Sequence, residues 1–192
     1  MKIGVDLDGV LGQTIPAVIE YHNTIHGTNL TLEQFHSNNY WEVWGGTREE
    51  AIQEVHNFYE TPYFKNIKPV IGARESLKTL KKNNELFIVT SRQNKIIPET
   101  KEWVEKYFPN IFSEMYFTNH FTQNGDTKTK KEVCDSLNVD VLIEDVVEYA
   151  VECVTAKRKI FLLDYPWNRD AVLPEGIQRV YSWEEIIEEI GN

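Results

Sequence analysis

Short apolar runs alternate along the chain with longer stretches in which apolar residues recur every three or four positions. A short apolar run is typical of a buried strand, whereas the three-to-four spacing is typical of an amphipathic helix. The runs predict strands at residues 2–6, 85–90, 114–118, 139–143, 159–163 and 178–181. Helical spacing appears between them, at 73–82, at 98–107 and from Ser182 onward. This alternation predicts an α/β fold with a mainly parallel sheet flanked by helices.

Residues 12–70 interrupt the alternation. They are too long for a tight connection between two neighbouring strands, and they contain helical stretches but no convincing strand pattern. We therefore expect a core made of residues 1–11 and 71–192, with residues 12–70 inserted after the first strand as a small helical cap. The aromatic run Tyr40–Trp44 either forms the interior of that cap or contributes one or two rings to a substrate pocket.

Size and charge narrow the function classes. A chain of 192 residues with 41% hydrophobic and 12% aromatic residues suits one packed domain with a modest insertion. The formal net charge of −10 comes from 30 acidic and 20 basic residues. Because nucleic acid polymers and anionic membranes attract basic surfaces, we expect neither as a partner. A small anionic substrate remains compatible with this charge if its site supplies cations.

The start of the chain, its apolar runs and its cysteines bear on the cellular compartment in which we expect the protein. A strand pattern that starts at residue 2 leaves no space for a signal peptide, and no apolar run reaches membrane-spanning length. Cys134 and Cys153 are too few for a disulfide framework and are expected to be buried thiols. We therefore expect a soluble, cytoplasmic protein. The pattern predicts nothing about its oligomeric state.

The first candidate chemistry lies at the end of the first strand, where Asp6 and Asp8 precede Gly9. Residues two apart on a strand point the same way, and glycine permits a sharp turn close to a ligand. Two such carboxylates repel each other unless a cation or a proton lies between them, which should raise the pKa of Asp8. They suit a Mg²⁺-assisted reaction at phosphorus with one nucleophile and one acid/base. The alternative is an ordinary acidic turn.

A second group of polar residues, Thr90, Ser91 and Arg92, follows the apolar strand at 85–90. Ligands of parallel sheets bind beyond the carboxyl ends of the strands, where a hydroxyl can donate to a phosphoryl oxygen. The alternative for the hydroxyls is a helix cap. Arg92 either contacts substrate or forms a surface ion pair.

A lysine lies at the start of a predicted helix. Thr129 and Glu132 form a capping box, so the helix should begin near Lys130. Lys130 shares a helical face with Val133 and Leu137 and should point toward the sheet, whereas Lys131 should face solvent. An inward lysine at a helix amino end is suited to a phosphate. The alternative is that the whole lysine run is solvated.

The strand at 139–143 leads into Glu144 and Asp145. Either carboxylate is a possible Mg²⁺ ligand, because hard cations prefer oxygen donors. The alternative for Asp145 is a cap on the helix that begins at Val146. Each of the four signals is weak when it is taken alone, but their order along the chain is specific.

That order resembles the haloacid dehalogenase (HAD) superfamily of phosphohydrolases, over residues 1–10 and about 68–165. The resemblance implies a HAD-like Rossmannoid core in which Asp6 becomes an aspartyl-phosphate. Asp8 would then protonate the leaving oxygen and activate water. Phosphate binding would fall to Thr90 and Lys130, with Ser91 beside them.

The resemblance also implies a metal site. Asp145 would bind Mg²⁺ together with the Asp6 carboxylate and the Asp8 backbone carbonyl. Glu144 stands where many members have aspartate, so it is either a ligand or a supporting residue. The acid at Asp8 argues against the dehalogenase branch.

Within the superfamily, the chain is most similar to the 5′(3′)-deoxyribonucleotidase-like group. The similarity rests on the first motif from Asp6 to Val10, the Thr90–Ser91 pair, the helical insertion and the run 161–169. It departs from the group at Arg92, where a proline is usual. Trp167 and Arg169 in the run either border the pocket or belong to a rigid turn after Pro166.

Three functions are expected from these features. The first is a Mg²⁺-dependent phosphomonoesterase acting on nucleoside or deoxynucleoside monophosphates, in which the aromatic cap stacks a base. The second is a phosphatase of a sugar phosphate or another small metabolite, with the same core chemistry. The third is a non-catalytic phosphate-binding or interaction module, which would not need a nucleophile such as Asp6.

Overall fold

The computed structural model of the chain describes residues 1–119 and 127–191. The strands within these residues are β1 (Lys2–Val5), β2 (Glu85–Thr90), β3 (Glu114–Phe117), β4 (Val141–Glu144), β5 (Lys159–Leu163) and β6 (Ile177–Val180). The α-helices are α1 (Thr14–His26), α2 (Tyr40–Trp44), α3 (Arg48–Phe58), α4 (Pro62–Lys65), α5 (Ala73–Leu80), α6 (Ile97–Tyr107), α7 (Lys130–Leu137), α8 (Val147–Cys153) and α9 (Trp183–Gly191). Two 3₁₀ turns lie at Leu32–Gln34 and Asn94–Ile96.

The described strands form one six-stranded sheet in the order β3-β2-β1-β4-β5-β6, and every neighbouring pair is parallel. Each predicted strand is confirmed to within two residues of its ends. Val5 at the end of β1 lies opposite Ile88 of β2 and Ile143 of β4. The chain leaves β1 toward β2 on one side and returns to β4 on the other, and α/β proteins bind ligands where the strand order switches in this way.

Helices cover both faces of the sheet. Apolar side chains of α5, α6 and α9 pack with one set of strand residues, and those of α7 and α8 pack with the other set. β1 is buried because it lies in the middle of the sheet, and Ile3 and Val5 are fully inaccessible. Cys134 and Cys153 are buried and free, as expected. The described part of the chain has no helix whose length and apolarity would let it cross a membrane.

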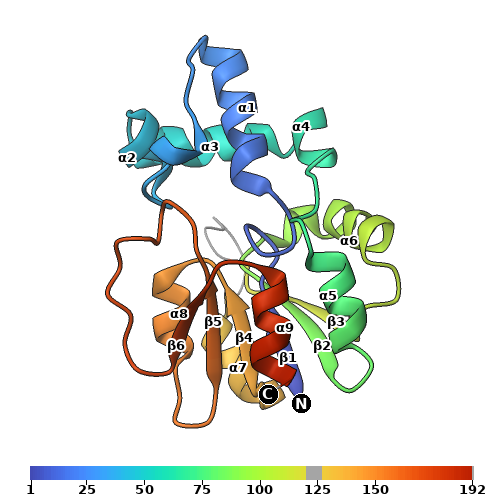
Figure 1. Cartoon of the computed structure of the whole chain (residues 1–192). Coiled ribbons are helices and arrows are strands. Elements are labelled where there is room, and N and C mark those ends of the chain that lie inside the picture. The colour runs from blue at the N-terminus through green and yellow to red at the C-terminus, as the bar shows by residue number, and fades with distance from the viewer. Residues whose placement is uncertain (120–126, 192) are drawn as a thin grey trace.

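Helices α1 to α4 lie together beyond the carboxyl ends of the strands, at the top of Figure 1, and the chain termini lie at the opposite end. The two connections to this insertion run side by side. Gln13 N–H donates to the Lys68 carbonyl at 2.8 Å, and Val70 N–H donates to the Leu11 carbonyl at 2.8 Å. These bonds join the start of the insertion to its end. They hold it beyond the carboxyl end of β1.

Candidate functional site

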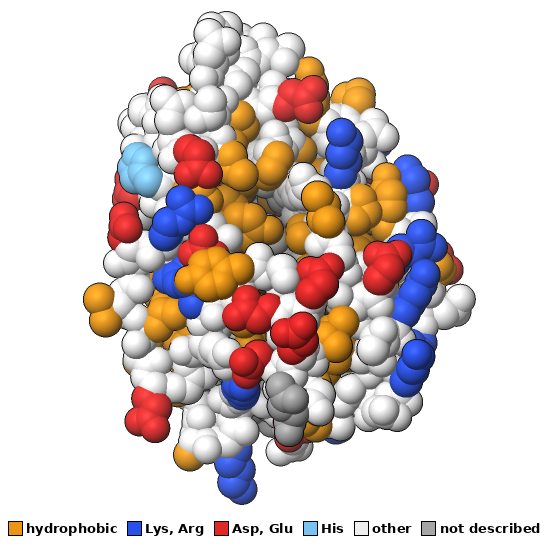
Figure 2. All heavy atoms as spheres, in the orientation of Figure 1, with side chains coloured by type: hydrophobic (Ala, Val, Ile, Leu, Met, Phe, Trp, Pro, Cys, Tyr) orange, Lys and Arg blue, Asp and Glu red, His pale blue; other side chains and the backbone are white. Residues whose placement is uncertain are grey.

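The polar residues of the four sequence signals meet at one edge of the sheet. Because β2, β1 and β4 are neighbours, the residues that follow these strands come together, although they are far apart in the sequence. A cavity of about 720 Å³ lies between this edge and helices α1 to α3. Figure 2 shows hydrophobic side chains gathered around a hollow between the upper helices and the sheet. The sheet edge supplies charged groups to the cavity, and the insertion supplies much of its apolar wall.

Lys130 lies in the centre of the charged groups. Its Nζ is 2.7 Å from Asp6 Oδ1 and 2.7 Å from Glu144 Oε2, and its side chain is 1% exposed. The capping box of Thr129 and Glu132 starts α7 at Lys130, as predicted, and thereby fixes the direction of this side chain. Burial by itself lowers the pKa of Lys130, but the two carboxylates raise it above its ordinary value. The lysine is therefore a permanent buried cation.

One ammonium does not neutralise the carboxylates around it. Oxygens of Asp6, Glu144 and Asp145 lie within 4.8 Å of one another. Burial, and then the negative charges of Glu144 and Asp8, raise the pKa of Asp6 to about 7 despite Lys130. Burial and the charges of Glu144 and Asp6 also raise the pKa of Asp145. This cluster therefore has an excess of negative charge and would be stabilised by a divalent cation.

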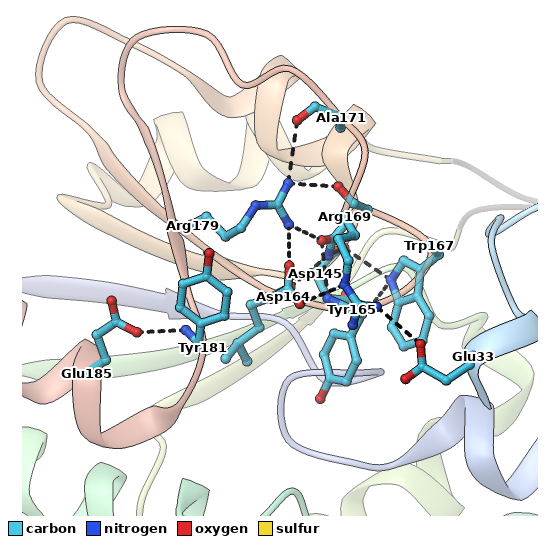
Figure 3. Close-up of polar contacts among 12 residues, drawn as sticks. Glu33, Asp145, Asp164, Tyr165, Trp167, Arg169, Ala171, Arg179, Tyr181 and Glu185 are labelled. Carbon is cyan, nitrogen blue, oxygen red and sulfur yellow. Dashed lines mark hydrogen bonds and ion pairs between the residues drawn. The ribbon is translucent and has the colours of Figure 1, made fainter.

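Asp145 shows where a cation fits. Its Oδ2 accepts a hydrogen bond from Trp167 Nε1 at 3.1 Å, and its backbone carbonyl accepts one from Asn168 Nδ2 at 2.7 Å. Figure 3 shows Trp167 beside Asp145, with Tyr165 next to it. Asp145 Oδ1 is buried without a hydrogen-bond partner among the described residues. An unpaired carboxylate oxygen among other carboxylates fits a hard cation such as Mg²⁺.

The loop after β1 passes very close to this carboxylate. Gly9 has φ +84°, and a Cβ built at this position would lie 2.1 Å from Asp145 Oδ2. The carbonyl of Gly9 accepts a hydrogen bond from the Tyr165 hydroxyl at 2.8 Å. Glycine is therefore required both for the backbone angle and for the approach to Asp145.

Asp8 lies in a different environment from Asp6. Arg92 Nη2 donates to its Oδ1 at 2.8 Å and Arg92 Nε donates to its Oδ2 at 3.0 Å, while the Thr14 hydroxyl donates to Oδ1 at 2.5 Å. Burial raises the pKa of Asp8, but the charge and hydrogen bonds of Arg92 and the bond from Thr14 outweigh burial and lower it. The expectation of a raised pKa was wrong, because the nearest charge is cationic.

Arg92 is a buried residue, which excludes the surface ion pair considered from the sequence. Besides Asp8, it donates from Nη1 to the Thr100 hydroxyl at 3.1 Å, and its guanidinium lies 4.9 Å from the ring centre of Phe64. Arg92 thus joins the acid of the first motif to α6 and to α4. The exposed Arg169 forms surface ion pairs with Glu33 and Asp164 instead.

Of the remaining predicted residues, some line the cavity and others lie behind its wall and bind residues that line it. Ser91 lines the cavity, whereas Thr90 lies behind it and its hydroxyl accepts from Arg92 N–H at 3.2 Å. Glu144 is completely buried and binds Lys130. Asp145 is not a helix cap, because α8 begins after Val146.

The aromatic run Tyr40–Trp44 contributes both to the interior of the insertion and to the wall of the cavity. Tyr40 and Trp41 line the cavity, while Tyr40 and Trp44 also pack edge-on against the buried ring of Phe35. Tyr59, which directly follows α3, lines the cavity as well. Burial and the charge of Asp8 raise the pKa of Tyr40 and Tyr59, so both stay phenols that can donate hydrogen bonds.

Sequence reasoning missed two residues of the site. The first is Thr14, whose hydroxyl donates to Asp8; in the sequence this threonine indicates only the start of a helix. The second is Tyr149 of α8, which lines the cavity with its ring centre 4.6 Å from Lys130 Nζ. Tyr149 lies in the first turn of α8, four residues after Asp145 in the sequence. For Trp167 the sequence allowed either a turn or the pocket border, and this residue both lines the cavity and binds Asp145.

Residues 1–191 match the family model described as 5′ nucleotidase, deoxy (pyrimidine), cytosolic type C protein. A Clostridium acetobutylicum protein named nucleotidase is 26% identical over 97% of this chain and 91% of its own length. The 5′(3′)-deoxyribonucleotidase of Bacillus subtilis is 24% identical over 96% of this chain and 95% of its own. A HAD-type protein of Bacillus subtilis, crystallised with bound magnesium, has a TM-score of 0.66 at 14% identity and covers 100% of this chain and 98% of its own. At this low sequence identity, the similarity to the magnesium-bound protein shows only that the two chains share a fold.

Replacing Gly9 by alanine tests the close approach to Asp145. We expect Gly9→Ala to lower the free energy of unfolding by more than the about 1–2 kcal/mol that a left-handed backbone alone costs a non-glycine residue, because its Cβ would overlap the carboxylate. The matched control is Gly27→Ala, at φ +66° with nothing within 4 Å of the added Cβ. Urea unfolding of both variants measures the difference, and equal losses would refute the steric account.

Proposed function

The chain belongs to the family of cytosolic type C deoxy (pyrimidine) 5′ nucleotidases, and we propose that it hydrolyses nucleoside or deoxynucleoside monophosphates through an aspartyl-phosphate on Asp6. It is a phosphoric monoester hydrolase with a HAD-type fold, and its substrate is a small phosphorylated molecule. The observation that carries the proposal is the position of Asp6 in the wall of the cavity, beside Lys130 and in one carboxylate cluster with Asp145, whose Oδ1 has no hydrogen-bond partner among the described residues. A binding module would need no such carboxylate.

Asp6 and Asp145 would hold Mg²⁺ through their carboxylates, and Asp8 through its backbone carbonyl. Bound Mg²⁺ neutralises negative charge on the phosphoryl oxygens and on the carboxylates that surround them. Lys130 and Ser91 would bind the other phosphoryl oxygens, because both line the cavity beside Asp6. The role of Thr90 as a phosphate donor stays a prediction, since its hydroxyl is turned to the Arg92 backbone.

In the first step, an oxygen of Asp6 attacks phosphorus, and the bond from phosphorus to the ester oxygen breaks. Asp8 donates a proton to the departing oxygen. In the second step, Asp8 takes a proton from a water molecule whose oxygen attacks phosphorus, so that the bond between phosphorus and the Asp6 oxygen breaks, inorganic phosphate leaves and the Asp6 carboxylate is restored. Asp8 is ionised beside Arg92 before substrate binds. The arrival of a phosphate dianion raises the Asp8 pKa by repulsion and favours the protonated form.

We propose residues 12–70 as the cap that selects the rest of the substrate. Its aromatic residues Tyr40, Trp41 and Tyr59 face the cavity, and flat rings of this kind stack on a nucleobase. A cavity of about 720 Å³ has the size usual for small-molecule sites. The names of the Clostridium and Bacillus relatives support the same substrate class.

A panel of phosphomonoesters tests the substrate class. We expect phosphate release from nucleoside or deoxynucleoside monophosphates in Mg²⁺, little release from sugar phosphates, and none in EDTA. Activity confined to sugar phosphates would assign a metabolite phosphatase instead. No release from any substrate, with the protein folded by circular dichroism, would leave a phosphate-binding module.

Two substitutions test the division of roles between the aspartates. Asp6→Asn should lower turnover by more than about a thousandfold, because it removes the nucleophile. Asp8→Asn should lower turnover by about 10²–10⁴-fold, the usual contribution of a general acid/base. Asp170→Asn, at an exposed residue outside the cavity, is the matched control and should keep full activity. Turnover of Asp6→Asn near that of the control would disprove the mechanism.

The raised pKa of Asp6 predicts how Mg²⁺ binding depends on pH. With a pKa of about 7, Asp6 holds a proton at pH 6 that competes with the cation and has lost it at pH 8. We therefore expect the Mg²⁺ dissociation constant to fall by about tenfold between pH 6 and pH 8 for this proton alone. Isothermal titration calorimetry in buffers of different ionisation enthalpy measures both the affinity and the released proton. A dissociation constant that stays unchanged over this range would contradict the prediction.

A further inference from the structure

Two histidines and a glutamate meet inside the insertion, away from the phosphate site. His22 and His26 lie one turn apart on α1, and Glu54 faces them from α3. His22 Nδ1 is 2.7 Å from Glu54 Oε1, and His26 Nε2 is 3.1 Å from Glu54 Oε2. One donor atom from each of the three side chains lies within 4.8 Å of the others. None of the three residues lines the cavity.

The donor set has the composition of a zinc site. Zn²⁺ is bound in proteins by imidazole nitrogens and carboxylate oxygens at about 2.0–2.2 Å, and three protein ligands with water as the fourth are a common arrangement. Histidines at positions i and i+4 of a helix present their rings on one face. The cluster around Asp6 and Asp145 contains oxygen donors alone and prefers Mg²⁺. The two clusters therefore differ in the metal that their chemistry favours.

The surroundings hold these ligands in place. The ring of His22 is buried and stacks on the Trp44 ring at 4.4 Å with an interplanar angle of 6°. The Glu54 side chain is 15% exposed, whereas that of His26 is 47% exposed. The open side at His26 gives an ion and a water molecule access to the cluster. A fixed first ligand with an accessible last one suits the capture of a metal from solution.

We propose that His22, His26 and Glu54 bind one Zn²⁺ ion that links α1 to α3. The inner faces of the same two helices line the substrate cavity, with Ile15 and Val18 from α1 and Val55 from α3. The ion fixes the spacing of these helices and so the shape of that wall. In the metal-free alternative, each imidazole N–H donates a hydrogen bond to Glu54. These hydrogen bonds would also join the two helices, but the cluster would then bind no metal ion.

Zinc binding by the tag-free protein distinguishes these states. Titration against a chromophoric chelator, with Mg²⁺ in excess to fill the oxygen site, should give one equivalent of Zn²⁺ per chain. His26→Gln should lower the affinity by at least the about 10–100-fold that accompanies the loss of an outer partner of a metal ligand. This variant changes the most exposed of the three side chains and should fold normally.

The matched control is His36→Gln, which changes an exposed histidine outside the cluster and should keep the wild-type zinc affinity. Zinc should also raise the melting temperature of the wild type and of this control, but not that of His26→Gln. Equal zinc affinity in all three proteins, or no zinc uptake by the wild type, would overturn the proposal. These measurements need no substrate, so a failure of the proposed nucleotidase activity would leave them unaffected.

Discussion

The buried ammonium of Lys130 is the interaction on which the acidic edge of the sheet depends. It holds Asp6, which comes directly after β1, and Glu144, at the end of β4, at 2.7 Å each. Removing a buried partner of this kind leaves uncompensated charges and destabilises a protein by several kcal/mol. The same contact attaches the first turn of α7 to the centre of the sheet. Lys130 therefore fixes both the geometry and the charge of the site.

Around that lysine, two carboxylates of the first motif have opposite pKa shifts. The pKa of Asp6 is raised to about 7 by burial among acids, and that of Asp8 is lowered because Arg92 outweighs the effect of burial. The proposed mechanism needs the reverse, an ionised Asp6 and a protonated Asp8. A divalent cation beside Asp6 favours its ionised form, and a phosphate dianion beside Asp8 favours its protonated form. In the proposed mechanism, a bound cation and the substrate would together bring both groups to the protonation states that the reaction requires.

Hydrophobic periodicity and helix capping were sufficient to predict the strands, their mainly parallel arrangement and the position of Lys130. Every strand in the described part of the chain matches a predicted apolar run, and the capping box at Thr129 correctly predicted that Lys130 points inward. The environment of Asp8 was not predictable in this way. It depends on Arg92 and Thr14, which reach it from different elements, and on their side-chain directions. Sequence spacing indicates which strand end a residue occupies, but it does not show which neighbour neutralises it.

The insertion carries both residues that line the cavity and a residue that binds the acid of the first motif. Gln13 bonds to Lys68 where the chain enters and leaves α1 to α4, and Thr14, at the start of α1, binds Asp8 directly. From the end of the insertion, Phe64 lies against the guanidinium that pairs with Asp8. The aromatic residues that line the cavity belong to other parts of the insertion, with Tyr40 and Trp41 in α2 and Tyr59 just after α3. Under the proposed function, a substrate that shifts these rings would also act on Asp8 and Arg92, because one small insertion carries both sets of contacts.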